Sequence, residues 1–223
     1  LINGKPMIQR VWEQAISSKL GDVIVACSEK EVRDCILSLG GKAVLTDPDI
    51  PSGTDRIFAA IKNKNDIDDF DSIINLQGDM PLIDPNDISK VNDPILQGFD
   101  IGTIATSLSK NQNVDQNVTK VKINWIKRNS IGQANDFFKS SINQKLDIYH
   151  HVGIYSFRYE SLKKFVSLPI SQNEIDLKLE QLRALDAKMT IGVSYVKNVP
   201  ISVDTKEDLD VVENIIKKQY EKN

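Results

Sequence analysis

The sequence predicts an α/β fold in which a mostly parallel sheet carries helices on both faces. Short apolar runs rich in β-branched residues alternate along the chain with longer segments of helical periodicity. The 223 residues are 40% hydrophobic and 26% charged, which is the balance of an ordinary globular domain. We therefore expect one domain, residues 1–223, built as a three-layer α/β/α sandwich around a Rossmann-like sheet with an antiparallel insertion.

The first part of the chain shows the alternation most clearly. Pro6 stands at the start of a segment whose apolar residues share one helical face, and Gly40-Gly41 ends a second helical segment. Short β-branched runs follow each of these segments. The elements expected there are a helix at 6–19, a strand at 23–27, a helix at 29–39, a strand at 43–46 and a helix that begins near Thr54.

The rest of the chain continues this order with one interruption. An apolar run at 72–77 predicts a buried strand, whereas polar turns dominate residues 111–145. We expect residues 111–145 to be a loop-rich insertion with antiparallel pieces, serving as a dimer interface or as a lid. The other expected elements are a helix beginning near Pro85, strands at 101–108, 149–157 and 189–196, a helix within 171–185 and a final helix at 206–218 capped by Asp204-Thr205.

Charge and composition narrow the function. The formal net charge of −3 gives no general attraction to nucleic acid or to an anionic membrane, so any bound phosphate needs local groups. No apolar run reaches the roughly 18 residues of a membrane-spanning helix. The two cysteines, Cys27 and Cys35, fit reduced core thiols rather than a disulfide framework. We therefore expect a cytoplasmic protein.

The chain opens in an unusual place for this fold. A doubly wound fold normally begins with a central strand and a phosphate-contacting loop. Leu1 instead stands directly before the first helical segment. We expect that the first strand and the N-terminal phosphate loop are missing from the printed sequence.

Two acidic residues follow apolar strands and indicate a metal site. Asp79 comes just after the run at 72–77, and Asp204 follows a second β-branched run at 201–203. Ligands of open α/β sheets bind beyond the carboxyl ends of the strands, where these side chains would converge. Two convergent carboxylates suit Mg²⁺ that carries a phosphate-bearing substrate. A plain turn residue is the alternative for Asp79.

Two further segments offer phosphate or base contacts. Lys5 places an ammonium group at a helix start, either near a phosphate or in solvent. Ser52, Gly53 and Thr54 expose backbone donors and two hydroxyls before a helix, and the glycine permits close approach of a flat base or a phosphate. Arg56 follows in the first turn, where the helix dipole does not favour a cation. A plain capped loop is the alternative.

The strand at 149–157 contains both histidines of the chain. Strand alternation sends His150 and His151 to opposite faces, which disfavours a shared zinc site. His151, Gly153 and Tyr155 share one face, and the glycine leaves room for a ligand. The alternative for His151 is a purely structural histidine.

Glu180 and Gln181 lie in a helical segment beside a stripe of leucines. The leucines at 179, 182 and 185 turn to the core, which leaves the two polar residues off the stripe. They either contact ligand hydroxyls or face solvent, and the spacing alone favours solvent.

Taken together, these segments resemble one family. The segments at 52–56, 76–81, 151–155, 179–185 and 203–209 occur in the order and spacing of the 3-deoxy-manno-octulosonate cytidylyltransferases, or CMP-Kdo synthetases. The resemblance runs from Leu1 to the end of the last helix. It implies the reaction CTP + Kdo → CMP-Kdo + pyrophosphate, with Mg²⁺, in a homodimer that serves lipopolysaccharide biosynthesis. It also implies an α/β sandwich like that of the nucleotide-diphospho-sugar transferases.

The resemblance implies a role for each matched residue. Asp79 and Asp204 would hold Mg²⁺, and Arg56 would neutralise the sugar carboxylate or a triphosphate oxygen. The nucleotide-binding residues would be Lys5, Ser52, Gly53, Thr54, Gln77 and Gly78. The residues around the acid sugar would be Lys139, His151, Tyr155, Glu180 and Gln181.

Several positions depart from the family pattern. The chain lacks the family's first strand and its arginine-rich phosphate loop, so we expect the printed chain to bind CTP weakly. Met80 stands where Glu is usual, Leu177 replaces an acidic residue, and Ser202 replaces Gly. Lys139 replaces Arg, which exchanges a bidentate fork for a point charge. The alternatives are CMP transfer to another acid sugar (sialic-type or amino-Kdo), action on a sugar phosphate, and a non-catalytic nucleotide-binding homologue.

Overall fold

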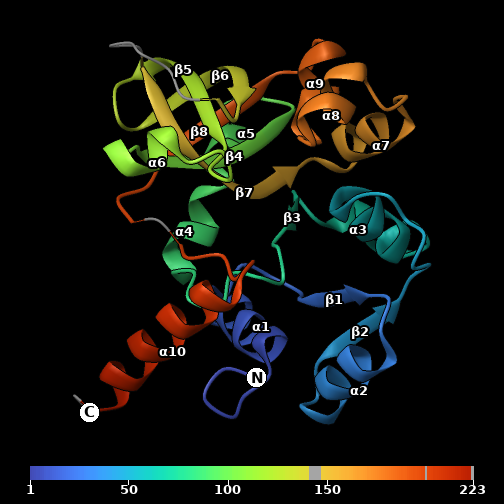
Figure 1. Ribbon diagram of the computed structural model, residues 1–223. Coiled ribbons are helices and arrows are strands. Elements are labelled where there is room, and N and C mark those ends of the chain that lie inside the picture. Colours follow the sequence, from blue (N-terminus) through green and yellow to red (C-terminus); the bar gives the residue numbers. More distant parts are fainter. Residues whose placement is uncertain (141–146, 199, 222–223) are drawn as a thin grey trace. The chain divides into compact units, whose positions relative to one another are not determined.

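The computed structural model describes residues 1–140, 147–198 and 200–221. These residues form two compact units (Figure 1). Unit 1 comprises Leu1–Pro51, Leu76–Ser89 and Pro200–Asn223, and unit 2 comprises Ser52–Asn75 and Lys90–Val199. In the described part of the chain, no helix is both long enough and apolar enough to cross a membrane.

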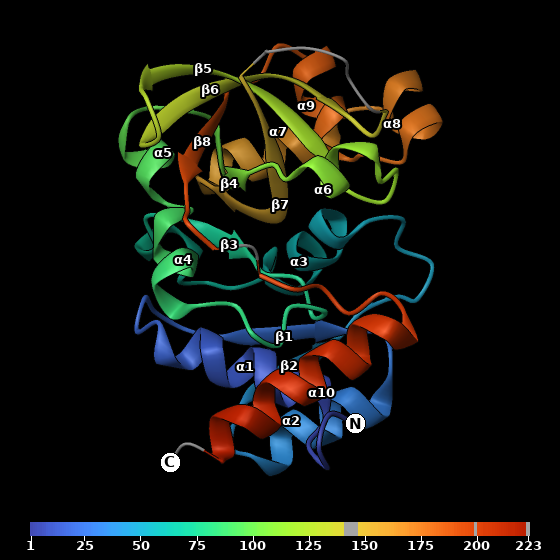
Figure 2. The ribbon, with the colours of Figure 1, turned by 60° about the vertical axis from the view of Figure 1, so that its left-hand side comes forward.

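Unit 1 contains the helix–strand alternation expected at the start of the chain. Strand β1 pairs in parallel with β2, with Ile24 opposite Lys42 and Cys27 opposite Leu45. Helix α2 packs against both strands (Figures 1 and 2). The elements are α1 (Met7–Ser17), β1 (Ile24–Cys27), α2 (Lys30–Ser38), β2 (Lys42–Leu45), α4 (Pro85–Lys90, which unit 2 completes) and α10 (Lys206–Tyr220).

The ends of these helices follow their capping residues. Helix α2 stops where expected, because Gly40 adopts a φ of 78° and the Gly41 amide donates to the Ile36 carbonyl at 3.0 Å. Thr205 caps α10 in a capping box with Asp208, as the sequence predicts. Cys27 and Cys35 are both free thiols, as expected.

Unit 2 is built on a six-stranded mixed sheet in the order β3-β7-β4-β8-β6-β5. Only β4 and β8 pair in parallel there, and the other described neighbours are antiparallel. The strands are β3 (Ile73–Asn75), β4 (Ile101–Ser107), β5 (Lys120–Lys127), β6 (Ile131–Phe138), β7 (Ile148–Phe157) and β8 (Ile191–Tyr195). The prediction of a mostly parallel sheet is therefore wrong for this sheet, because β7 returns between β3 and β4 and pairs antiparallel to both.

The antiparallel pieces expected within residues 111–145 are present. Strands β5 and β6 form a hairpin that lies side by side in both views (Figures 1 and 2), with Asn129 at a φ of 52° in its turn. Residues 141–146 of this stretch lie outside the described residues. A role as dimer interface or lid stays a prediction.

Short helices cover the sheet of unit 2. One helix was expected within 171–185, but the structure has two, because Lys178 adopts a left-handed φ of 53° between them. Gly102 lets the chain just before α5 lie close to the sheet, since a Cβ there would lie 2.2 Å from the Val91 carbonyl oxygen. The helices are α3 (Gly53–Ile61), η1 (Ile67–Asp69), α5 (Asp93–Leu96), α6 (Lys110–Val114), α7 (Tyr159–Ser167), α8 (Gln172–Leu177) and α9 (Gln181–Asp186).

Candidate active site

The two acids singled out by the sequence lie together in unit 1. Asp79 occupies a turn, and its carbonyl accepts a hydrogen bond of 2.9 Å from the Val203 amide, which brings the neighbouring Asp204 close. Asp79 is half-buried, and its Oδ1 is fully buried with no hydrogen-bond partner among the described residues. Burial, and then the charge of Asp204, raise the pKa of the Asp79 carboxyl. Among the described residues, Oδ1 of Asp79 thus has no hydrogen bond that would favour the charged carboxylate.

This donor set fits a divalent cation with a preference for oxygen. An unpaired carboxylate oxygen beside a second carboxylate is the ligand type that Mg²⁺ takes, usually with several waters and substrate phosphates. No group of three or more His, Cys, Asp or Glu side chains that could hold a metal occurs among the described residues. Asp79 and Asp204 would thus supply two ligands and leave the remaining positions to water and phosphate.

The other predicted residues of unit 1 lie in two segments. Lys5 is not free, because its Nζ lies 2.9 and 2.8 Å from the two carboxylate oxygens of Glu13 on α1. Gln77 and Gly78 lead directly into Asp79, and Gly78 is exposed. Their roles toward a nucleotide stay predictions.

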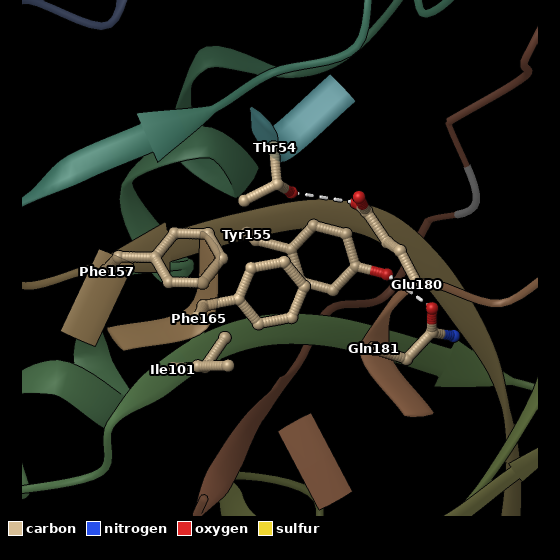
Figure 3. A pocket seen from close by; sticks show the side chains of 7 residues that line it. All are labelled: Thr54, Ile101, Tyr155, Phe157, Phe165, Glu180 and Gln181. Carbon is tan, nitrogen blue, oxygen red and sulfur yellow. Dashed lines mark hydrogen bonds between the residues drawn. The ribbon is translucent and has the colours of Figure 1, made fainter. Parts of the chain in front are cut away.

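In unit 2, a small pocket gathers four predicted residues (Figure 3). It encloses about 10 Å³, close to the least space that holds one water. Its floor is aromatic and aliphatic, and its polar ends come from Thr54, Tyr155, Glu180 and Gln181. The lining residues are Thr54, Ile101, Tyr155, Phe157, Phe165, Glu180 and Gln181.

The start of α3 supplies one polar end of this pocket. The Ser52 hydroxyl caps the helix by accepting from the Asp55 amide at 3.1 Å. Thr54 is 1% exposed, and its hydroxyl donates to Glu180 Oε1 at 2.9 Å while it accepts from Asn75 Nδ2 at 3.1 Å. Arg56 lies half-buried later in the same helix. Ser52 and Thr54 are therefore each hydrogen-bonded within the unit, and their role toward a nucleotide stays a prediction.

Glu180 and Gln181 are turned into the unit, so the solvent-facing interpretation that their spacing favoured is wrong, whereas contact with ligand hydroxyls stays a prediction. The Tyr155 hydroxyl donates to Gln181 Oε1 at 3.1 Å. Glu180 Oε2 and Gln181 Nε2 are buried without a hydrogen-bond partner in the described structure. Burial raises the pKa of Glu180, and the hydrogen bond from Thr54 and the charge of Arg183 oppose this shift. One unused acceptor and one unused donor are thus available to a ligand rich in hydroxyls.

His151 packs beside this pocket on β7. Its ring meets Phe137 edge-on at a centroid distance of 4.9 Å, and its Nε2 lies 3.0 Å from Thr103 Oγ1. Because Thr103 gives its proton to the Ile154 carbonyl at 2.8 Å, Nε2 of His151 is the donor and Nδ1 is left as an acceptor. Burial, with a smaller effect of His150, lowers the pKa of His151 to about 3. The imidazole is therefore neutral at physiological pH.

The neighbours of His151 explain the open space beside it. His150 has a separate partner, because Gln112 Nε2 lies 3.2 Å from His150 Nδ1. This agrees with the expectation that His150 and His151 point to opposite faces of the strand. The pairing of β7 with β4 jumps from Tyr155 opposite Thr103 to Val152 opposite Ile104, so β7 bulges at Gly153. A Cβ on Gly153 would meet nothing within 4 Å, which agrees with the space predicted there.

A buried ion cluster beneath the pocket was not predicted. Arg183 is 3% exposed and donates through Nε and Nη2 to Glu174 at 2.8 and 2.6 Å. Its Nη1 lies 3.5 Å from Asp55 Oδ2, and its guanidinium carbon lies 4.7 Å from the Phe165 ring centroid. Asp55 lies far from Arg183 in the sequence, and Glu174 lies nine residues away on another helix, so no helical spacing could have paired them.

A buried lysine supports the last predicted sugar residue. Lys120 is fully buried, and its Nζ donates to the carbonyls of Asp115 at 2.6 Å and Lys139 at 2.7 Å. Burial lowers the pKa of Lys120. Lys139 itself is half-buried after β6, and its contact with a sugar stays a prediction.

Known sequences decide the family. The sequence model of the cytidylyltransferases matches residues 1–191. The chain belongs to the cytidylyltransferase family. The resemblance seen in the sequence is thereby confirmed, and this cytidylyltransferase is a nucleotidyltransferase enzyme.

Individual relatives agree with this assignment. The 3-deoxy-manno-octulosonate cytidylyltransferase of Paramagnetospirillum magneticum is 40% identical over 219 residues, which cover 97% of this chain and 89% of the relative. That of Parvibaculum lavamentivorans is 40% identical and covers 94% of this chain and 82% of its own length. This cytidylyltransferase is thus similar over nearly its whole length to enzymes of that name.

Solved structures are also similar to this chain. CMP:2-keto-3-deoxy-manno-octonic acid synthetase, solved in complex with CTP, matches with a TM-score of 0.87 and 31% identity over 98% of this chain and 90% of its own. UDP-glucose pyrophosphorylase with UDP-glucose matches with a TM-score of 0.66 at 11% identity over 98% of this chain and 89% of its own. The second likeness concerns the fold alone.

Proposed function

We propose that this cytidylyltransferase transfers CMP from CTP to 3-deoxy-manno-octulosonate (Kdo) and releases pyrophosphate, giving CMP-Kdo for lipopolysaccharide biosynthesis. The observation that carries the chemistry is the buried, unpaired carboxylate oxygen of Asp79 beside Asp204. The names of relatives that match nearly the whole chain support the choice of substrates.

Asp79 and Asp204 would hold Mg²⁺ in this proposal. The bound ion would offset charge on the triphosphate and on the sugar carboxylate and would orient both. Asp79 must lose its proton to act as a ligand, and its raised pKa means that a proton competes with the metal at a higher pH than for an ordinary aspartate.

The segment from Ser52 to Thr54 would bind the cytosine base. Its backbone can offer carbonyls to the exocyclic amine of cytosine, which uracil lacks, and Ser52 and Thr54 keep the loop in one conformation. The other nucleotide contacts would come from Lys5, Arg56, Gln77 and Gly78. Lys5 would exchange its bond with Glu13 for a phosphate oxygen.

The polar residues at the ends of the pocket in unit 2 would contact the acid sugar, which is much larger than the space for one water inside the pocket. Glu180 Oε2 would accept from a sugar hydroxyl, and Gln181 Nε2 would donate to a sugar oxygen, so that each buried unpaired atom gains a partner. Tyr155 would hold Gln181 in place. His151 would act as a neutral hydrogen-bonding group, and Lys139 would attract the sugar carboxylate.

Nucleotidyl transfer forms a bond between the anomeric oxygen of Kdo and the α-phosphorus of CTP. The bond from the α-phosphorus to the bridging oxygen breaks, and pyrophosphate leaves with its electrons. His151 would be a poor acceptor for the anomeric proton, because its pKa of about 3 lies far below neutral pH. We propose that this proton passes to solvent and that the site acts by alignment and charge compensation.

The remaining features of the proposal concern assembly and compartment. A homodimer is supported by the exposed apolar residues Val114 (68% exposed) and Ile126 (70% exposed) within residues 111–145. The free thiols of Cys27 and Cys35 suit the cytoplasm. The single three-layer domain expected from the sequence stays part of the proposal.

A pyrophosphate-release assay on the complete gene product tests the function. CTP, UTP and dTTP are each combined with Kdo, amino-Kdo, a sialic-type acid and a sugar phosphate. We expect CTP with Kdo to give the highest kcat/KM, Asp79→Asn to abolish turnover, and the matched Asp210→Asn on the exposed face of α10 to leave it unchanged. Preference for another sugar, or Mg²⁺-dependent CTP binding without turnover of any sugar, would refute the proposal.

A further inference from the structure

A single hydrogen bond joins two segments of the pocket that lie far apart in the sequence. Thr54 stands at the start of α3 and Glu180 directly before α9, and the Thr54 hydroxyl donates to Glu180 Oε1 at 2.9 Å (Figure 3). Both residues line the pocket. Neither side chain can change its position without losing this bond.

The bond belongs to a chain of hydrogen bonds that runs from Asn75 through Thr54 to Glu180. Asn75 Nδ2 donates to Thr54 Oγ1 at 3.1 Å, so the single hydroxyl proton of Thr54 is directed toward Glu180. Glu180 Oε1 is thereby occupied, whereas Oε2 is buried without a partner in the described part of the chain. The hydroxyl of Thr54 therefore fixes the orientation in which Glu180 keeps one oxygen for a ligand.

Arg183 ties the same two segments together a second time. It lies one turn along α9 from Glu180, and its Nη1 is 3.5 Å from the carboxylate of Asp55, the neighbour of Thr54. The two bonds from Arg183 to Glu174, at 2.8 and 2.6 Å, hold the guanidinium in place. The starts of α3 and α9 are thus held to each other by a hydrogen bond and by a buried ion pair.

We propose that the Thr54–Glu180 hydrogen bond couples the two substrate subsites, so that nucleotide and acid sugar each bind more tightly when the other is present. This inference rests on the proposed function, which assigns the loop at Ser52–Thr54 to the nucleotide and Glu180 to the sugar. The bond is formed without either ligand, so a ligand at one end restricts the motion that the bond still has, and the ligand at the other end then loses less entropy on binding. The enhancement must be the same in both directions, because it is one coupling free energy.

Calorimetric titration of the complete protein with Mg²⁺ measures this coupling. The ligands are CTP and a Kdo analogue without the anomeric hydroxyl, which cannot react because it lacks the attacking oxygen. We expect each ligand to lower the Kd of the other by about fivefold or more. Thr54→Val keeps the branched shape but removes the donor, and we expect the enhancement to fall to about onefold. Thr54→Ser restores the hydroxyl and should restore the enhancement.

A matched control separates coupling from a general effect of buried threonine. Thr106 is also 1% exposed, and its hydroxyl donates to the Lys197 carbonyl at 3.3 Å, away from the pocket. We expect Thr106→Val to keep the full enhancement. If Thr54→Val does not fold, amide exchange of the wild-type protein replaces it, and the sugar analogue alone should slow exchange of the amides at 53–55.

The outcomes distinguish this inference from the proposed function. If neither ligand binds alone, the proposed function fails. If both bind but their Kd values are independent, or if Thr54→Val keeps the enhancement, the coupling is overturned while the function stands. Unchanged amide exchange at 53–55 with the sugar analogue bound would also overturn it.

Discussion

Removal of the Arg183 side chain should test how strongly the buried ion cluster stabilises unit 2. Arg183→Met removes two charge-assisted hydrogen bonds to Glu174, at 2.8 and 2.6 Å, and the approach to Asp55 at 3.5 Å. It leaves the Glu174 carboxylate, in a residue 8% exposed, without its partner. Breaking a buried pair from one side costs about 3–5 kcal/mol. In a chain of this length, that loss lowers Tm by about 6–20 °C.

Urea unfolding followed by near-ultraviolet circular dichroism measures the change in the free energy of unfolding. We expect the double variant Arg183→Met with Glu174→Leu to recover most of the loss, because an apolar pair of similar volume replaces the ion pair. Arg158→Met is the control, since exposed Arg158 donates a hydrogen bond to the Ile95 carbonyl at 2.7 Å, and the variant should lose no more than about 1.5 kcal/mol. A loss below about 1 kcal/mol for Arg183→Met, or a double variant no more stable than the single one, would refute the reasoning.

Two further predictions concern titrating groups. Asp79→Asn should raise the Tm of the metal-free protein at neutral pH, because the raised pKa of Asp79 means that folding disfavours its charged form. Thermal denaturation in the presence of a chelator measures this gain in Tm, which should vanish as the pH falls through that pKa. A lower Tm of the variant at neutral pH would contradict the assignment. His151 has a pKa of about 3 when folded and about 6.5 when unfolded, so the stability that its neutral form contributes is complete above pH 6.5 and declines as the pH falls toward 3. Urea unfolding between pH 7 and 4.5 should show that the free energy of unfolding declines by up to about 1.4 kcal/mol per pH unit because of His151. We expect His151→Asn to remove this decline. An equal decline in the variant would show that another group titrates.

Local structure could be predicted because its determinants are close together in the sequence. Pro6, Gly40-Gly41 and Thr205 set helix ends within a few residues of where the chain places them. The direction of strand pairing could not be predicted in this way. An apolar run such as 72–77 indicates a buried strand, but β3 pairs with β7, which lies much later in the chain.

The residues of the candidate site likewise fall into those that the sequence could predict and those that it could not. Asp79 and Asp204 were found because each follows an apolar run, and the structure brings them together. The expected strand at 201–203 is wrong, because these residues are extended chain without strand pairing, and the Val203 amide bonds to the Asp79 carbonyl instead. Glu180 and Gln181 could not be placed from spacing, because Lys178 breaks the helix in a left-handed conformation and re-aims α9. Arg183 carried no signal, since its charge is meaningful only beside Glu174 and Asp55.

Lys120, the first residue of β5, gives the β5–β6 hairpin a boundary that depends on one side chain and on backbone carbonyls. Its ammonium group holds the carbonyl of Asp115 at one end of the excursion and that of Lys139 at the other, and carbonyls are offered by every amino acid. Substitutions at the exposed positions of the hairpin, and changes in the length of its turn, can therefore accumulate while the base of the excursion stays closed. The lysine itself is constrained, because a fully enclosed site has no room for the wider guanidinium of arginine.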